Sequence, residues 1–263
     1  IRRLISPERS MKLCKSLTLM LRKADGMGNK KKQNFYEWAH EHLSKLLIRM
    51  FRITIIGAEN QPDEGGLIAV SNHISFLDVI VMAVALKRQI RFMAKKELFG
   101  IPLLGGLIKS LGAFPVDRKG SVAGSMKKAI AFLKEGDIVG MFPTGHRFRD
   151  VPVEKTLDKV KGGVGMAAYH AKAPMLPLYI STKNNHVRLF RPITIYVGKP
   201  VEYDELGFVK GGADEYENAA KFVFSKVIEL SRDAALGSGT VDQHKLLSDD
   251  KANTVDTEDK RNG

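Results

Sequence analysis

Short runs of β-branched and aromatic residues alternate with longer stretches of helical periodicity from residue 52 onwards. The runs predict the strands Ile53–Ile56, Leu67–Val70, Arg91–Met93, Phe114–Val116, Ile138–Phe142, Met175–Ile180 and Ile193–Val197. The stretches between and after them predict helices over residues 77–86, 102–110, 121–134, 161–171 and 214–236. Alternating strands and helices are typical of an α/β fold in which helices cover both faces of a mainly parallel central sheet.

This α/β domain is expected to occupy residues 51–236 of the 263-residue chain. Hydrophobic residues make up 44% of the sequence, which is enough for an ordinary packed core without disulfides or metal ions. Beyond the domain, residues 237–263 turn polar and lose periodicity, which predicts a flexible tail. The last helix should close the core with an apolar face formed by Phe222, Val223, Val227 and Leu230.

The first 50 residues differ from the rest of the chain in their positive charge. Residues 1–32 contain ten Lys and Arg against two acids, and the whole chain has a net charge of +13. Two amphipathic helices are expected here, one beginning at Ser6–Glu8 and one over Asn34–Met50. Basic helices with an apolar face favour binding to an anionic membrane surface. The alternatives are a solvated tail, packing on the main domain, or nucleic-acid binding, although the sequence has no obvious nucleic-acid recognition motif.

Three further features concern the compartment. The chain has one cysteine, Cys14, which cannot form an internal disulfide, so a reducing compartment is expected. The longest run without a charged residue, Gly65–Leu77, has 13 residues, whereas a membrane-spanning helix needs about 20. No segment has the layout of a cleavable signal peptide. The sequence therefore predicts a protein at the cytoplasmic face of a membrane, peripheral or monotopic.

A histidine follows the predicted strand Leu67–Val70, and an aspartate follows that histidine five residues later. Ligands of open α/β sheets bind beyond the carboxyl ends of the strands, so His73 lies at a favourable position. On one continuous helix, two residues with this spacing would diverge by about 140°. His73 and Asp78 can therefore meet only if His73 lies in the loop and Asp78 lies at the start of the next helix, with Ser75 as a cap.

A carboxylate beside an imidazole can make the imidazole a general base. Asp78 would fix the tautomer of His73 and leave the other ring nitrogen free to accept a proton. This is the base half of a catalytic triad without the serine, so the substrate must supply the attacking hydroxyl. From this segment alone, an ordinary loop histidine is the alternative, because many histidines have an aspartate five residues away.

Three more predicted strand ends carry cations beside glycines. Lys95 and Lys96 follow the third strand, Arg118 follows the fourth, and Arg147 follows the fifth. Arg binds phosphate through its planar fork, and Lys binds it as a compact point charge. Each loop alone could be a solvated turn. Together with His73 they predict an anion pocket, and hence a phosphorylated substrate that carries a hydroxyl.

These segments together resemble the glycerolipid acyltransferase family, typified by the bacterial 1-acyl-sn-glycerol-3-phosphate acyltransferases. The family has several ordered sequence blocks, and the resemblance covers about residues 50–205. The matching segments are Asn72-His73 with Asp78, Ala94–Leu98 with Pro102 and Gly105, Phe114–Arg118, Phe142–Arg147, and Lys161–Gly163 followed by Pro174–Pro177. One block would be a weak signal, whereas the ordered set is a strong one.

The resemblance implies a fold like that of glycerol-3-phosphate acyltransferase and an acyl-transfer reaction. His73 would deprotonate the free hydroxyl of lysophosphatidic acid, and Asp78 would orient His73. The hydroxyl would then attack the thioester of acyl-CoA or acyl-carrier protein, giving phosphatidic acid in phospholipid synthesis. No cofactor is expected, and no cluster of residues has metal-ligand spacing. Glycerol 3-phosphate or another lysophospholipid is the alternative acceptor.

The resemblance also implies roles for the binding residues. The acyl chain would run past Pro174 and Pro177. The residues that would bind the acceptor phosphate are Arg118, Arg147, Lys95 and Lys96. The residues expected in the motif loops beside the acceptor are Asn72, Thr144, Gly145 and His146.

This chain departs from the family pattern in the segment after the fifth predicted strand. Thr144 stands where the family has Glu, and His146 stands where the family has Thr. Thr144 could hydrogen-bond a hydroxyl, but it cannot supply a carboxylate. His146 could add positive charge beside Arg147, or it could be an ordinary loop histidine. A weakly active, lipid-binding relative of the family is therefore a second hypothesis.

Overall fold

The computed structural model covers the α/β part of the chain and little of either end. The described residues are 48–49, 52–101, 105, 108, 112–116, 122–187 and 191–237. The expected two-helix element and the expected polar tail lie almost wholly outside these residues, and Arg118 lies outside them too. Most of the helix expected over residues 102–110 also lies outside them. These features stay predictions.

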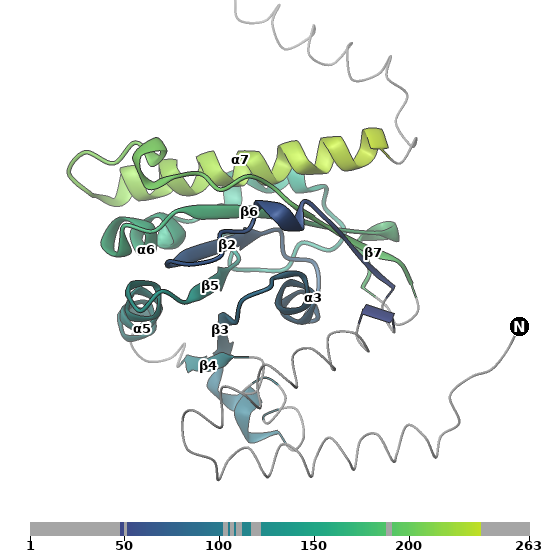
Figure 1. The fold of residues 1–263 in the computed structure, drawn as a ribbon, viewed down its shortest axis with the longest axis horizontal. Helices are drawn as coiled ribbons and strands as arrows, with labels where there is room; N and C mark the ends of the chain where they lie inside the picture. The colour runs from purple at the N-terminus through teal and green to yellow at the C-terminus, as the bar shows by residue number, and fades with distance from the viewer. Residues whose placement is uncertain are drawn as a thin grey trace, which may run out of the picture.

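The described residues form seven strands in one sheet, and each matches an expected strand to within two residues at either end. Their order across the sheet is β1-β7-β6-β2-β5-β3-β4 (Figure 1). The strands are β1 (Ile53–Ile56), β2 (Leu67–Ser71), β3 (Ile90–Lys95), β4 (Ala113–Val116), β5 (Ile138–Met141), β6 (Met175–Thr182) and β7 (Ile193–Val197).

Five neighbouring strands, from β6 to β4, run parallel to one another. Strand β7 is antiparallel to β6, and β1 is parallel to β7, so these two run in the opposite direction. Parallel strands covered on both faces need continuous apolar sequence, and Leu67–Val70 of β2 are fully buried. Because the five parallel strands share a direction, their last residues lie along one edge of the sheet, which we call the carboxyl edge.

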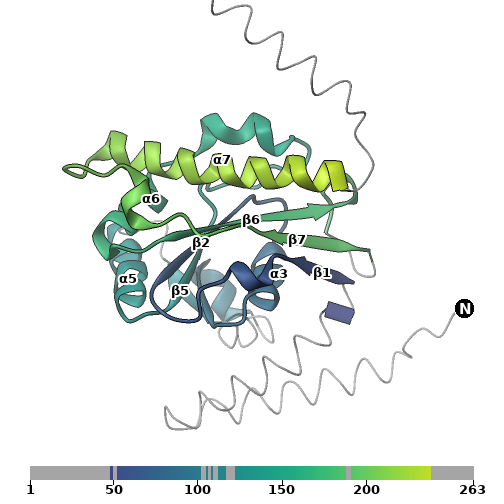
Figure 2. The same ribbon diagram turned by 45° about the horizontal axis from the view of Figure 1, so that its top comes forward.

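Helices cover both faces of the sheet, as expected. Helix α3 (Asp78–Ala85) packs on one face and contributes Val81 and Met82 to a buried cluster there. On the other face lie α5 (Val122–Lys134), α6 (Gly163–Ala171) and α7 (Ala213–Gly237), which share a second cluster (Figures 1 and 2). Among the described residues, no helix combines the length and the hydropathy that a membrane span requires.

The last helix, α7, buries a different aromatic residue from the one that the sequence suggested. Phe222 is 40% exposed, so its assignment to the buried face is wrong, whereas Val223 and Val227 are buried as expected. The buried aromatic residue is Phe224. With 100° between successive residues, Phe224 falls beside Val223 on the buried stripe, and Phe222 falls about 150° from the centre of that stripe.

The two longest of the five 3₁₀ helices in the described residues lie where loops were expected. They are η2 (Lys96–Gly100), which follows β3, and η3 (Val153–Lys159), which lies beyond β5 and packs on α7. Helices of five and seven residues span only about two 3₁₀ turns, which is too short to give a clear hydrophobic period, so the sequence pattern did not predict either helix. Both helices follow strands that end at the carboxyl edge.

Candidate active site

The loop after β2 brings His73 and Asp78 into contact, as their spacing predicted. His73 lies two residues beyond β2, and Asp78 is the first residue of α3. The His73 Nδ1 atom lies 2.8 Å from Asp78 Oδ2. The Asp78 side chain is completely buried, whereas that of His73 is 17% exposed. The carboxylate is thus shielded from water, while the imidazole can be reached from outside.

A single oxygen atom of Asp78 organises this loop. Besides contacting His73, Asp78 Oδ2 accepts hydrogen bonds from the backbone N–H groups of Ile74 and Ser75, both at 2.7 Å. Ser75 had been expected to cap α3, but its hydroxyl does not do so. It accepts the N–H of Leu77 at 3.2 Å and stabilises the turn before the helix. The loop is therefore wrapped around the carboxylate that also holds the imidazole.

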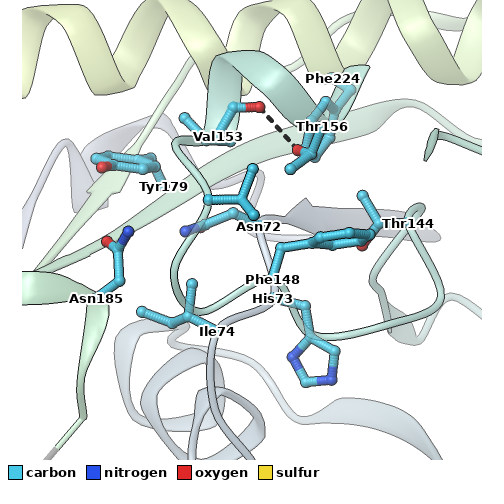
Figure 3. Close-up of a pocket in the computed structure, with 11 residues that line it drawn as sticks. Asn72, His73, Ile74, Thr144, Phe148, Val153, Thr156, Tyr179, Asn185 and Phe224 are labelled. Carbon is cyan, nitrogen blue, oxygen red and sulfur yellow. Dashed lines mark hydrogen bonds between the residues drawn. The ribbon is translucent and has the colours of Figure 1, made fainter. Parts of the chain in front are cut away.

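The imidazole of His73 is also held by Phe142, which follows β5. The two rings are stacked, with centroids 4.0 Å apart and planes inclined by 15°. Because a carboxylate is an acceptor, Nδ1 carries the proton, and its N–H donates a hydrogen bond to Asp78. The other nitrogen, Nε2, then has a free lone pair and no hydrogen-bond partner among the described residues. Figure 3 shows the ring pointing away from the other labelled side chains.

Asn72, between β2 and His73, ties the loop to β6. Its Nδ2 donates to the carbonyl oxygen of Ile180 at 3.0 Å, and its Oδ1 accepts the N–H of Ile180 at 2.8 Å. The side-chain amide thus stands in for a backbone peptide and continues the pairing of β2 with β6 beyond the strand. This pairing fixes the strand end from which His73 projects.

Replacing Asn72 with alanine is expected to lower the free energy of unfolding by about 2–4 kcal/mol, because two buried backbone groups of Ile180 lose their partner. Urea denaturation measures this change. Asn60→Ala is the control, since Asn60 Nδ2 makes one part-buried bond to a backbone group, the carbonyl oxygen of Val197, at 2.9 Å. It should cost about half as much. Equal losses in the two variants would show that the second bond of Asn72 contributes nothing.

A tight turn after β5 brings the next segment back against the loop of His73. Gly145 has a φ of +67°, a conformation that favours glycine, and its N–H donates to the carbonyl oxygen of Phe142 at 3.0 Å. Three residues later, the N–H of Phe148 donates to the carbonyl oxygen of His73 at 2.8 Å. The two loops are therefore joined by a backbone hydrogen bond as well as by the stacked rings.

Thr144, at the departure from the family pattern, lies inside this turn. Its side chain is 3% exposed, and its hydroxyl donates to the carbonyl oxygen of His146 at 3.0 Å. His146 itself is exposed. The threonine hydroxyl therefore helps to close the turn.

The predicted cations lie at different strands along the carboxyl edge. Arg147 follows β5, which is the direct neighbour of β2, and its side chain is exposed. Lys95 ends β3 and Lys96 begins η2; both are exposed. Strand β3 is two strands from β2, a separation of about 10 Å. The structure thus brings Arg147 to the loop of His73 and leaves the two lysines farther along the edge.

Comparison with known proteins decides the family. The family model described as Acyltransferase matches residues 52–181. A curated 1-acyl-sn-glycerol-3-phosphate acyltransferase from Bacillus subtilis is 34% identical over 170 residues, which cover 63% of this chain and 82% of that protein. The chain belongs to the acyltransferase family. It is an O-acyltransferase.

Two further relatives agree with this assignment. A 1-acyl-sn-glycerol-3-phosphate acyltransferase from Streptococcus pneumoniae is 39% identical over 113 residues, which cover 42% of this chain and 40% of that protein. The crystal structure of the 1-acyl-sn-glycerophosphate (LPA) acyltransferase from Thermotoga maritima matches with a TM-score of 0.60 at 25% identity. That match covers 81% of this acyltransferase and 87% of the solved chain.

The prolines expected beside the acyl chain lie away from His73 in this acyltransferase. Pro174 precedes β6, at the edge of the sheet opposite the carboxyl edge, and its carbonyl oxygen accepts the N–H of Ile68 at 3.0 Å. Pro177 is buried within β6, opposite Val70 of β2. The structure therefore does not bring these two residues to the loop of His73, and their contact with an acyl chain stays a prediction.

A pocket opens behind the loop of His73, on the side away from the imidazole (Figure 3). No Asp, Glu, Lys or Arg lines it. Burial, reinforced by the charge of Glu154, raises the pKa of the Tyr179 hydroxyl in its wall, so this group stays protonated and can donate. The other residues in its wall are Asn72, His73, Ile74, Thr144, Phe148, Val151, Val153, Thr156, Asn185 and Phe224.

Sequence reasoning missed Tyr179, Asn185 and Phe224 as residues of this pocket. They come from β6, from the short 3₁₀ turn η4 (Lys183–Asn185) after it, and from α7. All three lie more than 100 residues beyond His73, and none belongs to a motif. One local signal was available, because the Lys183-Asn184-Asn185 segment follows a predicted strand just as the basic loops do.

Proposed function

We propose that this O-acyltransferase moves a fatty acyl group from acyl-CoA or acyl-carrier protein to the free hydroxyl of lysophosphatidic acid, giving phosphatidic acid. The observation that carries the proposal is the His73–Asp78 pair, with Nδ1 held at 2.8 Å by a buried carboxylate and Nε2 unpaired among the described residues. The names of the relatives from Bacillus subtilis and Streptococcus pneumoniae support the choice of acceptor.

In this reaction His73 Nε2 takes the proton of the acceptor hydroxyl as its oxygen attacks the thioester carbonyl carbon. The new C–O bond forms, the C–S bond breaks, and the departing thiolate takes the proton back from His73. Asp78 keeps Nδ1 protonated and stabilises the imidazolium that forms in between. Phe142, stacked on the ring at 4.0 Å between centroids, limits the rotation of the imidazole.

The acceptor phosphate would be bound by Arg147, the cation that follows the strand next to β2. A planar guanidinium suits the bidentate binding of phosphate oxygens. Lys95 and Lys96, about two strand spacings from β2, would attract the anion rather than bind it in the same contact. Arg118, which lies outside the described residues, keeps its predicted role as a further phosphate ligand.

The test is the release of free thiol from an acyl donor by the purified 263-residue chain. We expect release from acyl-CoA or acyl-carrier protein only when lysophosphatidic acid is added, with phosphatidic acid as the second product. Glycerol 3-phosphate and other lysophospholipids form the comparison panel, because Thr144 replaces the family glutamate. Turnover of another acceptor in place of lysophosphatidic acid would overturn the choice of acceptor, and no turnover with any donor would overturn the proposal.

The membrane part of the proposal depends on residues 1–50, nearly all of which lie outside the described residues. We propose that this basic element binds an anionic membrane surface on the cytoplasmic face, making the protein peripheral or monotopic. Deleting residues 1–32 removes a net charge of +8, so co-sedimentation with liposomes that contain anionic lipid is expected to fall strongly. Neutral liposomes are the control. Unchanged co-sedimentation would show that the anchor lies elsewhere.

A further inference from the structure

One large apolar side chain on the loop of His73 is not explained by core packing. Phe76 is 68% exposed, although its neighbours Ile74 and Asp78 are 3% and 0% exposed. An exposed ring contributes little to the hydrophobic stabilisation of the fold. The loop therefore buries Ile74 and Asp78 and leaves the ring of Phe76, between them, at the surface.

A guanidinium group from the loop after β5 lies against this ring. The Cζ atom of Arg147 lies 3.5 Å from the centroid of the Phe76 ring. That distance is the contact distance of a stacked cation–π pair. Stacking uses the flat face of the guanidinium and leaves the N–H groups, which lie in its plane, free to donate.

A second contact fixes the same arginine relative to the base. The residue after Arg147, Phe148, donates its N–H to the carbonyl oxygen of His73 at 2.8 Å. Arg147 is thus held through its backbone neighbour on one side and through its side chain on the other. No carboxylate of the described residues forms a salt bridge with Arg147.

We propose that Phe76 is a positioning residue: its ring orients the Arg147 guanidinium so that the N–H edge faces the phosphate of an acceptor whose hydroxyl lies at His73. This inference rests on the proposed function, because it takes the acceptor to be a phosphorylated alcohol. Phe76 itself does not touch the reacting atoms. It sets the direction in which Arg147 donates, and so it acts on acceptor binding.

The competing explanation is that Phe76 contacts the lipid part of a substrate or the membrane. Two substitutions separate these explanations. Phe76→Leu keeps an apolar side chain and removes the π face, whereas Phe76→Tyr keeps the π face. Because Phe76 is 68% exposed, both variants are expected to fold, and thermal denaturation checks this.

We expect Phe76→Leu to raise the KM for lysophosphatidic acid about two- to five-fold, the range typical of an exposed cation–π pair, with a smaller change in kcat. Phe76→Tyr should have the same KM as the original chain. In an Arg147→Met background, Phe76→Leu should have no further effect on KM. An unchanged KM in Phe76→Leu would overturn the proposal and favour the lipid contact. The same holds if Phe76→Leu raises KM by the same factor with and without Arg147→Met.

A binding measurement keeps this inference separate from the proposed function. Glycerol 3-phosphate, a soluble phosphorylated alcohol, is titrated while the Arg147 Nε–H resonance is followed by NMR. A shift that saturates in the original chain and in Phe76→Tyr, but needs a higher concentration in Phe76→Leu, supports the inference even if lysophosphatidic acid is not turned over. Identical titrations in all three chains would overturn it, whatever the acylation assay gives.

Discussion

Replacing His73 with alanine is expected to lower kcat for thiol release about 10²- to 10⁴-fold, the range typical of a lost general base. No described residue hydrogen-bonds Nε2, so its lone pair is the one that the proposed reaction uses. The fold should survive, because the hydrogen bond that His73 accepts from Phe148 uses the backbone carbonyl oxygen and not the ring.

Chemical rescue gives this prediction a sharper control. The His73 side chain is 17% exposed, so added imidazole can enter the space that the missing ring leaves beside Phe142 and Asp78. We expect imidazole to restore part of the lost kcat in His73→Ala and to change the original chain little. A loss smaller than about tenfold, with an unchanged melting temperature, would mean that His73 is not the base.

Replacing Asp78 is expected to give two different results for asparagine and alanine, because Oδ2 accepts all three hydrogen bonds made to the carboxylate. The N–H groups of Ile74 and Ser75 repel an amide nitrogen, so Asp78→Asn must point its oxygen at them. The same oxygen then keeps Nδ1 of His73 protonated. The variant loses the negative charge and retains the tautomer.

We therefore expect kcat of Asp78→Asn to fall about 10²-fold, less than the ~10⁴-fold loss that follows a wrong tautomer in a serine-protease triad. Asp78→Ala should lose more activity and also about 2–6 kcal/mol of stability, because one buried and one part-buried backbone N–H group are left unpaired. Steady-state kinetics and urea denaturation measure the two losses. If both variants were equally slow and equally unstable, the shared-oxygen arrangement would be incorrect.

The contact between His73 and Asp78 could be predicted because it is local. The spacing of five residues rules out a common helix face, and the apolar run after Ser75 indicates where the next helix begins. The seven strands were predictable for a similar reason, since most are short apolar runs next to polar residues, glycine or proline. Both predictions depend on residues close together in the chain.

Contacts made across the sheet could not be predicted in this way. Phe142 stacks on His73, and Phe76 meets Arg147, only because β5 lies directly beside β2. The order of strands depends on how the whole chain packs, and no local pattern records it. The error at Phe222 has a different origin: Phe222 and Phe224 lie about 200° apart around the helix, and the sequence analysis placed the wrong one on the apolar face.

The reversed direction of β1 has a consequence for how the enzyme meets its substrate. Its first residue, Ile53, pairs with Ile193, and Ile193 pairs with Thr182 at the end of β6. The chain therefore enters the sheet at the carboxyl edge, the edge that carries His73. A lipid anchor in residues 1–50 would be tethered to the catalytic side of the domain. Acceptor and base would then meet by diffusion within the plane of the bilayer, at a high effective concentration.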